Sequence, residues 1–318
     1  MSLHKNEWLD SWRHEFVDGH IVGYSGRVSE ERPNLHFLHG NGFAVQTYRQ
    51  FLTALGDDYN LLLQEAAGHG RSSAGKRFVG WNNTAKRFSA SLNAQVAKQP
   101  KQPKQPKQPK QPTIGMGHSF GGCMTLLMSA QQPDLFDRLI LLDPALFPPR
   151  LLWLMRTVKV LGLKNHAPLV KQARRRRKQW ETLDQVRANF TGRGTFKGWE
   201  STCLEDYIQH SIRQDQTTKQ YHLICPSWME AAVFASYPKG LWRAIRSISV
   251  PTYIVQGEET FSYFKAAYKL AAKINPNIKL IEVKGGHCFM QQYPEQSAQT
   301  VRELLQPMRE QRQQETKP

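Results

Sequence analysis

The sequence contains no long apolar run, and its first residues are not an apolar segment. None of its stretches reaches the roughly 20 consecutive apolar residues that a membrane-spanning helix needs, so we predict no transmembrane segment. The first ten residues, MSLHKNEWLD, carry charges where a signal peptide would have its apolar core. With 40% hydrophobic and 22% charged residues, the 318-residue chain has the composition of an ordinary globular protein. We therefore expect a cytoplasmic location.

Cysteine is also scarce, and cofactor motifs are missing. The four cysteines, at positions 123, 203, 225 and 288, form no Cys-x-x-Cys pair and show no zinc-like spacing. They are predicted to be reduced thiols in or near the core, with no disulfide framework and no metal site. The sequence has no Gly-x-Gly-x-x-Gly after a strand and no P-loop, so no cofactor is expected.

Acidic residues are too few to balance the basic ones. The chain has 43 Lys and Arg against 26 Asp and Glu, a formal net charge of +17. Five lysines belong to one repeat and Arg174–Lys178 adds five more charges, which leaves +7 for the remaining residues. An excess of that size on a globular surface requires no polyanionic partner, so neither nucleic acid nor an anionic membrane is expected to bind. The basic run is interpreted as one end of a helix with a solvated face.

Residues 98–112 are five consecutive copies of Lys-Gln-Pro. Proline at every third position removes backbone donors and favours an extended polyproline conformation. The lysines repel one another, and no apolar side chain is available for burial. The repeat is therefore predicted to be an exposed loop. Strand-like residues resume at Thr113, so the repeat does not mark a domain boundary.

On both sides of the repeat, strand signals alternate with helix signals. Apolar runs predict strands at 34–39, 59–63, 113–117, 139–142, 251–256 and 278–283. Apolar residues at helical spacing predict helices at 44–55, 81–96, 122–131 and 294–312. Repeated βα units of this kind favour an α/β fold with a mostly parallel sheet flanked by helices.

The pattern changes in the middle of the chain. Residues 147–240 are helical in spacing, basic and rich in tryptophan, with no clear strands. Because sheet strands are predicted on both sides of this block, we interpret it as a helical lid inserted into a core formed by residues 1–146 and 241–318. Its aromatic residues fit two interpretations, an apolar roof over a substrate pocket or a set of contacts that hold the lid to the core.

Ser119 is the strongest candidate for a catalytic residue. It is the centre of Gly117-His118-Ser119-Phe120-Gly121, a Gly-x-Ser-x-Gly pattern that falls between an apolar strand and an apolar helix. That context is the one the pattern requires, because the serine must sit on a tight strand-to-helix turn where bulky neighbours would clash. The helix start behind the turn favours negative charge. The pattern therefore indicates a serine nucleophile.

Four motifs together resemble the α/β-hydrolase superfamily over nearly the whole chain, the repeat excepted. They are His39-Gly-Asn-Gly-Phe43, Gly68-His-Gly-Arg-Ser72, Gly117-His-Ser-Phe-Gly-Gly122 and Gly285-Gly-His-Cys-Phe-Met290. The resemblance implies the α/β-hydrolase fold with a lid after the strand that ends at Asp143. It also implies that His287 is the general base for Ser119, and that the backbone N–H groups of Asn41 and Phe120 form an oxyanion hole. By the same resemblance, His39 braces the oxyanion loop and His118 is a structural residue of the elbow.

The acid of the triad is less clearly marked. In most of the superfamily it lies three residues after a glycine that follows the strand at 251–256, and here that position is Thr260, which cannot serve. Glu258 or Glu259 could turn in from the same loop. Asp143 could act instead from the end of the preceding strand, as in some superfamily members, although an Asp-Pro turn there is also a common structural feature. We favour Asp143.

These residues predict a serine hydrolase that cleaves a carboxylic ester or a related acyl bond of a small, apolar substrate through an acyl-enzyme. Dehalogenases and epoxide hydrolases of this fold use a carboxylate nucleophile, which a serine at position 119 excludes. A C–C bond hydrolase, a thioesterase or an amidase is compatible with the same residues. A catalytically silent small-molecule binding protein is the alternative outside enzymology, and its support is the absence of the usual acid.

Overall fold

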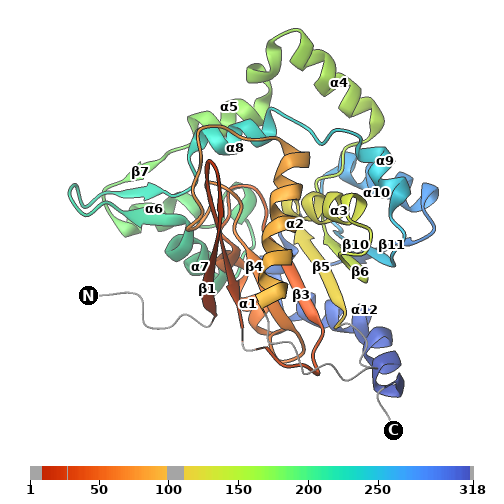
Figure 1. Ribbon diagram of the computed structural model, residues 1–318. Coiled ribbons are helices and arrows are strands. Elements are labelled where there is room, and N and C mark those ends of the chain that lie inside the picture. Colours follow the sequence, from red (N-terminus) through yellow and green to blue (C-terminus); the bar gives the residue numbers. More distant parts are fainter. Residues whose placement is uncertain (1–8, 27, 99–110, 316–318) are drawn as a thin grey trace.

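The computed structural model describes residues 9–26, 28–98 and 111–315, and its centre is an eight-stranded sheet (Figure 1). In spatial order the strands are β1 (Asp10–Phe16), β2 (Gly19–Ser25), β4 (Asn60–Gln64), β3 (Asn34–Leu38), β5 (Thr113–His118), β6 (Arg138–Leu142), β10 (Thr252–Gly257) and β11 (Ile278–Val283). The six strands β4, β3, β5, β6, β10 and β11 pair in parallel, whereas β1 and β2 form an antiparallel edge. This mostly parallel sheet confirms the predicted α/β fold.

The β1–β2 hairpin is absent from the sequence-based prediction. Three of the seven residues of β1 are charged and none is fully buried, so the strand gives no apolar run. It pairs along its whole length with β2, from Asp10 opposite Ser25 to Phe16 opposite Gly19. β2 buries Ile21, Val22 and Tyr24 in the two cores, whereas β1 owes its place to its pairing with β2.

Helices cover both faces of the sheet because the side chains of each strand alternate between two cores. In β4, Leu62 enters one apolar cluster, and Leu61 and Leu63 enter the other. The Leu62 side is covered by α2 (Trp81–Lys98), α3 (Phe120–Gln131), α9 (Leu241–Ser247) and α10 (Ser262–Ile274). The opposite side is covered by η1 (Val45–Tyr48), α1 (Arg49–Thr53), α11 (Phe289–Gln292) and α12 (Pro294–Glu315).

The segment between β6 and β10 leaves the sheet and builds a separate layer (Figure 1). It contains α4 (Pro149–Val160), η2 (Leu163–His166), α5 (Pro168–Arg175), α6 (Leu183–Phe190), η3 (Gly194–Phe196), α7 (Ser201–Ser211) and α8 (Ser227–Phe234). It also contains an antiparallel sheet of β7 (Gln179–Trp180), β9 (Tyr221–Leu223) and β8 (Ile212–Gln214). The expectation of a segment without strands was therefore wrong. Strands of two or three residues are too short to show the alternation that reveals a strand in a sequence.

Aromatic side chains fasten the inserted segment to the core. Phe43, in the loop after β3, lies 5.5 Å from Trp199 and 5.9 Å from Tyr207, measured between ring centroids. Phe196 lies 4.8 Å from Trp199 and 4.7 Å from Tyr207. Of the two interpretations of these aromatics, attachment to the core is the one that their contacts support, since all four belong to or pack against the main apolar cluster.

The connection from α2 to β5 contains the Lys-Gln-Pro repeat. α2 ends at Lys98, and the carbonyl of Pro112 accepts a 2.9 Å hydrogen bond from the backbone N–H of Asn34. The predicted exposed loop falls almost wholly on residues 99–110, which lie outside the described residues. None of the helices in the described part of the chain has the length and hydropathy of a bilayer-spanning segment.

The packing of α2 on the sheet yields a stability prediction. Phe88 is fully buried within the Leu62-side core, whereas Lys86 in the same helix is exposed. Phe88→Ala should lower the free energy of unfolding by about 3–5 kcal/mol, because it removes apolar contacts and leaves a cavity. Lys86→Ala, the matched control, should change it by less than about 0.5 kcal/mol. Urea denaturation measures both, and equal effects would mean that α2 does not contribute to the core.

Candidate active site

Ser119 lies at the turn between β5 and α3, with the backbone strained into a positive φ of 53°. Two glycines allow the backbone to pack closely at this turn. A Cβ on Gly117 would lie 2.5 Å from the carbonyl oxygen of Gly121, and one on Gly121 would lie 2.2 Å from that of Leu38. Both distances are far below van der Waals contact, so larger residues would displace the turn. The elbow predicted from the Gly-x-Ser-x-Gly pattern is therefore the local structure that the chain adopts.

His287 follows β11 and a Gly-Gly pair, and its ring reaches Ser119. Its Nε2 lies 3.0 Å from the Oγ of Ser119. Its Nδ1 lies 3.5 Å from Oδ1 of Asp143, which is an ion-pair distance but too long for a hydrogen bond. The side chain of His287 is 19% exposed, whereas that of Asp143 is fully buried. The three residues thus form a continuous row from the sheet interior to the surface of the site.

Asp143 directly follows β6 and is held by three donors, which lie at the end of β10, in the loop after it and in α10. Its Oδ1 accepts hydrogen bonds from the hydroxyls of Thr260 at 2.8 Å and Tyr268 at 2.6 Å, and its Oδ2 accepts one from the N–H of Gly257 at 3.2 Å. Three donors stabilise a carboxylate and fix its orientation. Thr260 stands at the sequence position where the superfamily's acid is expected. Its hydroxyl donates to the carboxylate of Asp143, which lies beside His287 instead.

The two glutamates considered as alternative acids lie elsewhere. Glu258 and Glu259 are exposed on the loop after β10, and among the described contacts neither reaches His287. The backbone carbonyl of Glu258 accepts a hydrogen bond from Lys265, and the N–H of Glu259 donates to the carbonyl of Gly285. The structure thus brings Asp143, and not these glutamates, to the ring of His287.

The turn Gly40–Phe43 presents one free backbone donor beside the elbow. The N–H of Gly40 donates to the hydroxyl of Tyr48, that of Gly42 to Nε2 of His69, and that of Phe43 to the carbonyl of Gly40. Among the described residues, no acceptor is found for the N–H of Asn41.

Phe120 offers a second free donor next to the same turn. It is the first residue of α3, so its N–H has no partner within the helix. The two amides predicted as an oxyanion hole, those of Asn41 and Phe120, are thus left available by the fold.

A chain of buried hydrogen bonds connects this turn to His287. Tyr48 accepts from Gly40 and contacts Nδ1 of His118 at 2.6 Å, and Nε2 of His118 lies 2.8 Å from the carbonyl oxygen of His287. A carbonyl only accepts, so His118 carries its proton on Nε2 and accepts from Tyr48 on Nδ1. His118 therefore positions the backbone of His287, in agreement with its interpretation as a structural residue.

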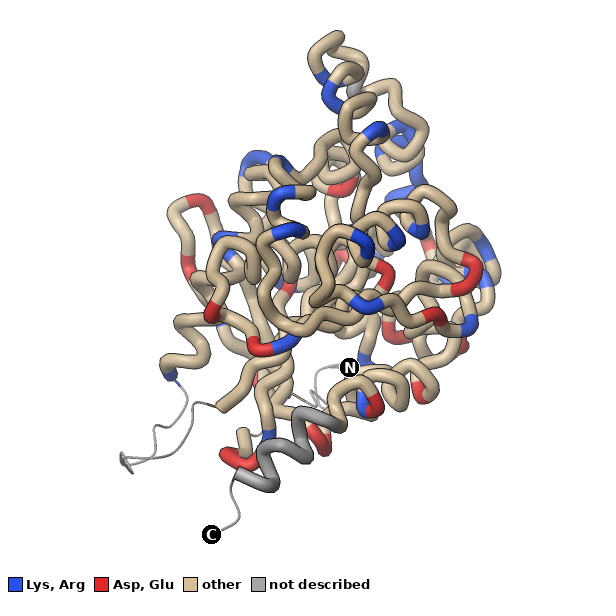
Figure 2. The backbone as a smooth tube through the Cα atoms, turned by 90° about the vertical axis from the view of Figure 1, so that its right-hand side faces the viewer, with Lys and Arg blue, Asp and Glu red and all other residues tan. Residues whose placement is uncertain are grey.

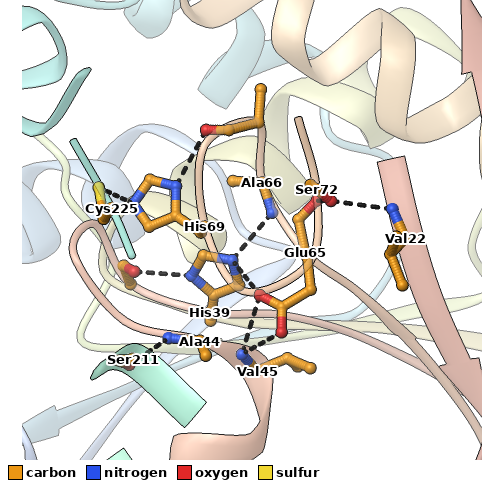
Figure 3. A network of polar contacts seen from close by, with 12 residues as sticks. Val22, His39, Ala44, Val45, Glu65, Ala66, His69, Ser72, Ser211 and Cys225 are labelled. Carbon is orange, nitrogen blue, oxygen red and sulfur yellow. Dashed lines mark hydrogen bonds and ion pairs between the residues drawn. The ribbon is translucent and has the colours of Figure 1, made fainter. Parts of the chain in front are cut away.

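Two further histidines, His39 and His69, form hydrogen bonds with the backbone of the turn Gly40–Phe43 (Figure 3 shows both side chains). Nε2 of His39 accepts from the N–H of Ala66 at 2.9 Å, so its proton is on Nδ1, which donates to the carbonyl of Gly40 at 2.7 Å. Figure 3 also shows Glu65 beside His39, with 3.3 Å between Oε2 and Nε2. Burial raises the pKa of Glu65 to about 8 and lowers that of His39 to about 3. The contact therefore joins two neutral groups and is not an ion pair at neutral pH.

The inserted segment also touches the turn. The side-chain amide of Asn41 donates to the backbone carbonyl of Glu230 in α8 at 3.2 Å. The carboxylate of Glu230 pairs with Arg176, which also donates to the hydroxyl of Tyr207 in α7 at 3.0 Å. The rest of the basic run is exposed, as expected of a helix end with a solvated face, whereas Arg176 is half-buried and paired with Glu230. A run of identical residues gives no sign that one of them meets a buried carboxylate.

Two cavities lie near the site without including the reacting groups. A cavity of about 20 Å³ lies behind Phe120, lined in part by Ile21, Met229 and Val233, and a surface depression of about 620 Å³ adjoins it. Neither is lined by Ser119 or His287. Among the described side chains, no group of three or more His, Cys, Asp or Glu is arranged to hold a metal ion.

A sequence model of the alpha/beta hydrolase family matches residues 37–300, a range that includes the turn, the elbow, Asp143 and His287. The chain belongs to the alpha/beta hydrolase family. This assignment agrees with the order of the strands and with the insertion after β6.

Curated relatives match this family member over part of their length. The abhydrolase domain-containing proteins AKT2 and ACTT2 of Alternaria alternata are 36% and 31% identical over 103 and 145 residues. The uncharacterized hydrolase YugF of Bacillus subtilis is 27% identical over 127 residues. The matched region spans 34%, 47% and 42% of these proteins. The relatives are thus named as hydrolases, but less than half of each is matched.

Solved structures share the fold over nearly the whole chain. The peroxisomal alpha-beta-hydrolase Lpx1 of Saccharomyces cerevisiae superimposes with a TM-score of 0.72 at 16% identity, over 95% of this chain and 88% of its own. E-2-(acetamidomethylene)succinate hydrolase gives a TM-score of 0.69 at 16% identity, over 94% and 99%. Identity this low shows a common fold and not a common substrate.

The buried histidines predict how stability depends on pH. Burial lowers the pKa of His36, His39 and His69 to about 4, 3 and 4, from 6.5 in the unfolded chain. Below pH 6.5 the unfolded state therefore binds more protons, and each histidine lowers the free energy of unfolding by about 1.4 kcal/mol per pH unit as the pH falls towards 4. Glu65, with its raised pKa, has the opposite slope between pH 4.5 and 8 and offsets one histidine.

The variant His36→Phe isolates one of these terms, because His36 stacks on Phe136 inside the sheet core and lies in no contact with Ser119 or His287. Its unfolding free energy should depend on pH between 6.5 and 4.5 less steeply than that of the wild type, by about 1.4 kcal/mol per unit. Urea denaturation at several pH values measures the two slopes. Parallel slopes would show that the pKa of His36 in the folded protein is the same as in the unfolded chain.

Proposed function

We propose that this member of the family is a serine hydrolase that cleaves a carboxylic ester or a related acyl bond of a small apolar substrate. The observation that carries the proposal is the row of Ser119, His287 and Asp143, with 3.0 Å between Nε2 and Oγ and 3.5 Å between Nδ1 and Oδ1. A serine hydroxyl is a weak nucleophile until a neighbouring imidazole accepts its proton. The relatives named as hydrolases agree with this class of reaction.

In the proposed reaction, Oγ of Ser119 attacks the substrate carbonyl while Nε2 of His287 takes the hydroxyl proton. The carbonyl oxygen becomes an oxyanion, and the N–H groups of Asn41 and Phe120 donate to it. His287 then gives its proton to the leaving alcohol as the acyl-enzyme forms. A water molecule, deprotonated by the same imidazole, attacks the acyl-enzyme and releases the acid and free Ser119.

Asp143 is assigned the orienting role in this scheme. The imidazole becomes positively charged when it takes the proton, and a buried carboxylate close to Nδ1 stabilises that charge and selects the reactive tautomer. Its hydrogen bonds from Thr260, Tyr268 and Gly257 hold the carboxylate in place between turnovers. The 3.5 Å separation from His287 shortens to a hydrogen bond as charge develops, since catalytic contacts tighten in the substrate complex.

The nucleophile is tested with p-nitrophenyl acetate. Ser119→Ala should lower kcat/KM on the order of 10⁴-fold or more, because no other hydroxyl in the described residues meets His287. The wild type should also be labelled by a fluorophosphonate probe, and the variant should not. A wild type that neither turns over the ester nor takes the label would reverse the proposal in favour of a binding protein. The same assay with a thioester substrate shows whether the enzyme prefers an ester or a thioester bond.

The acid is tested by two matched variants. Asp143→Asn should lower kcat on the order of 10⁴-fold with little change in KM, because an amide neither balances the imidazolium nor selects the tautomer. Glu259→Gln, an equally conservative change on the exposed loop, should leave kcat within twofold. Thermal unfolding of both variants shows that the loss is not one of folding. The assignment fails if Glu259→Gln is the inactive variant.

A further inference from the structure

The hairpin formed by α4, η2 and α5 exposes an unusual amount of apolar surface. Six of the ten large hydrophobic side chains that are exposed in the described residues lie between positions 153 and 169. They are Trp153, Leu154, Val160, Leu161, Leu163 and Leu169, and we call them the apolar crest. α4 has no buried residue and projects from the body of the molecule in Figure 1. A contiguous apolar patch of this kind marks an interaction surface.

Four members of the crest lie along α4 and its C-terminal cap, Leu161. Trp153 and Val160 are seven residues apart, as are Leu154 and Leu161, so both pairs repeat after two helical turns on the same side. Trp153 is 69% exposed, Val160 79% and Leu161 64%. These side chains point away from the protein and do not form an inner face of the inserted segment.

The surroundings of the crest carry charge of one sign. Between Pro144 and Trp180 the chain has ten Lys and Arg residues and no Asp or Glu. Arg150, Arg156, Lys171 and Arg175 are exposed, and Arg174 binds only the neutral side chain of Asn165. In Figure 2 the projecting segment at the top has blue bands and no red one. Arg176 is excluded from this set, because it pairs with Glu230.

We infer that the apolar crest docks the protein on an anionic lipid surface, with the crest in the apolar boundary and the surrounding basic residues at the headgroups. Tryptophan and leucine on one side of a helix, flanked by Lys and Arg, are the features of a helix that lies in a membrane interface. Anionic lipids attract such basic segments. A nucleic acid would use the charges but leave the apolar crest in water, and two copies of the chain would bring like charges together.

This inference departs from the expectation drawn from the sequence, which weighed charge alone. The sequence did not reveal that the side chains of the crest point outward, because this depends on how α5 packs on α8. Val170 and Ala173 of α5 bury themselves against Ala231 of α8, which leaves Leu169 exposed and holds α4 outside the core. The surface thus created is independent of the catalytic assignments, so its test uses binding rather than turnover.

Sedimentation of the full chain with lipid vesicles tests the inference. The protein should bind vesicles of phosphatidylcholine and phosphatidylserine at about 70:30, bind pure phosphatidylcholine at least tenfold more weakly, and lose affinity as salt is raised. Trp153→Ser with Leu161→Ser should lower the partition coefficient about tenfold or more. Val17→Ser, which removes a 109% exposed side chain from the β1–β2 turn, is the matched control and should bind like the wild type.

A second variant separates the crest from the lysines of the repeat, since these also attract anionic lipid. Replacing Lys98, Lys101, Lys104, Lys107 and Lys110 by Gln should weaken binding only modestly. The inference is overturned if this variant loses binding while the double serine variant keeps it, or if no vesicle is bound. It is also overturned if light scattering finds a wild-type dimer that the double serine variant dissociates, because the crest would then be an interface between copies.

Discussion

The close backbone approach between the end of β3 and the start of α3 sets the geometry on which the site depends. At Gly121 the helix lies so near the carbonyls of Leu38 and His39 that a single added carbon would overlap them. This contact places the turn after β3, which contains Asn41, beside the elbow that carries Ser119 and Phe120. The strained φ of Ser119 is tolerated because the strand and the buried helix on either side leave the turn no alternative.

Around this contact, buried polar side chains hold the backbone of the turn and of His287 in place through hydrogen bonds. His39, His69 and His118 each carry one ring nitrogen as donor and one as acceptor, and both nitrogens of each contact a polar atom. Neutral imidazole suits this task, because it donates and accepts at fixed angles without bringing a charge into the interior. Burial lowers the pKa of each of these histidines, so they stay neutral at neutral pH and keep this donor and acceptor pattern.

Much of this arrangement could be predicted from the sequence. The parallel strands are short apolar runs, and the elbow and the histidine after β11 carry motifs whose context is local. Asp143 could be favoured because Thr260 occupies the usual position of the acid. What escaped prediction depends on tertiary contacts: β1, whose polar residues join the sheet by pairing alone, the short strands β7 to β9, and the burial of Arg176 within a run of identical residues.

The insertion after β6 has a consequence for the order in which the site is assembled. Ser119 and Asp143 lie on adjacent strands and are synthesised close together, before the inserted segment. His287 is 168 residues beyond Ser119 and joins them only when β11 has taken its place at the far edge of the sheet. A chain still attached to the ribosome with β11 unmade therefore has Ser119 and Asp143 but not the imidazole that lies between them in the complete chain. Under the proposed function, activation of the hydroxyl has to await completion of the sheet.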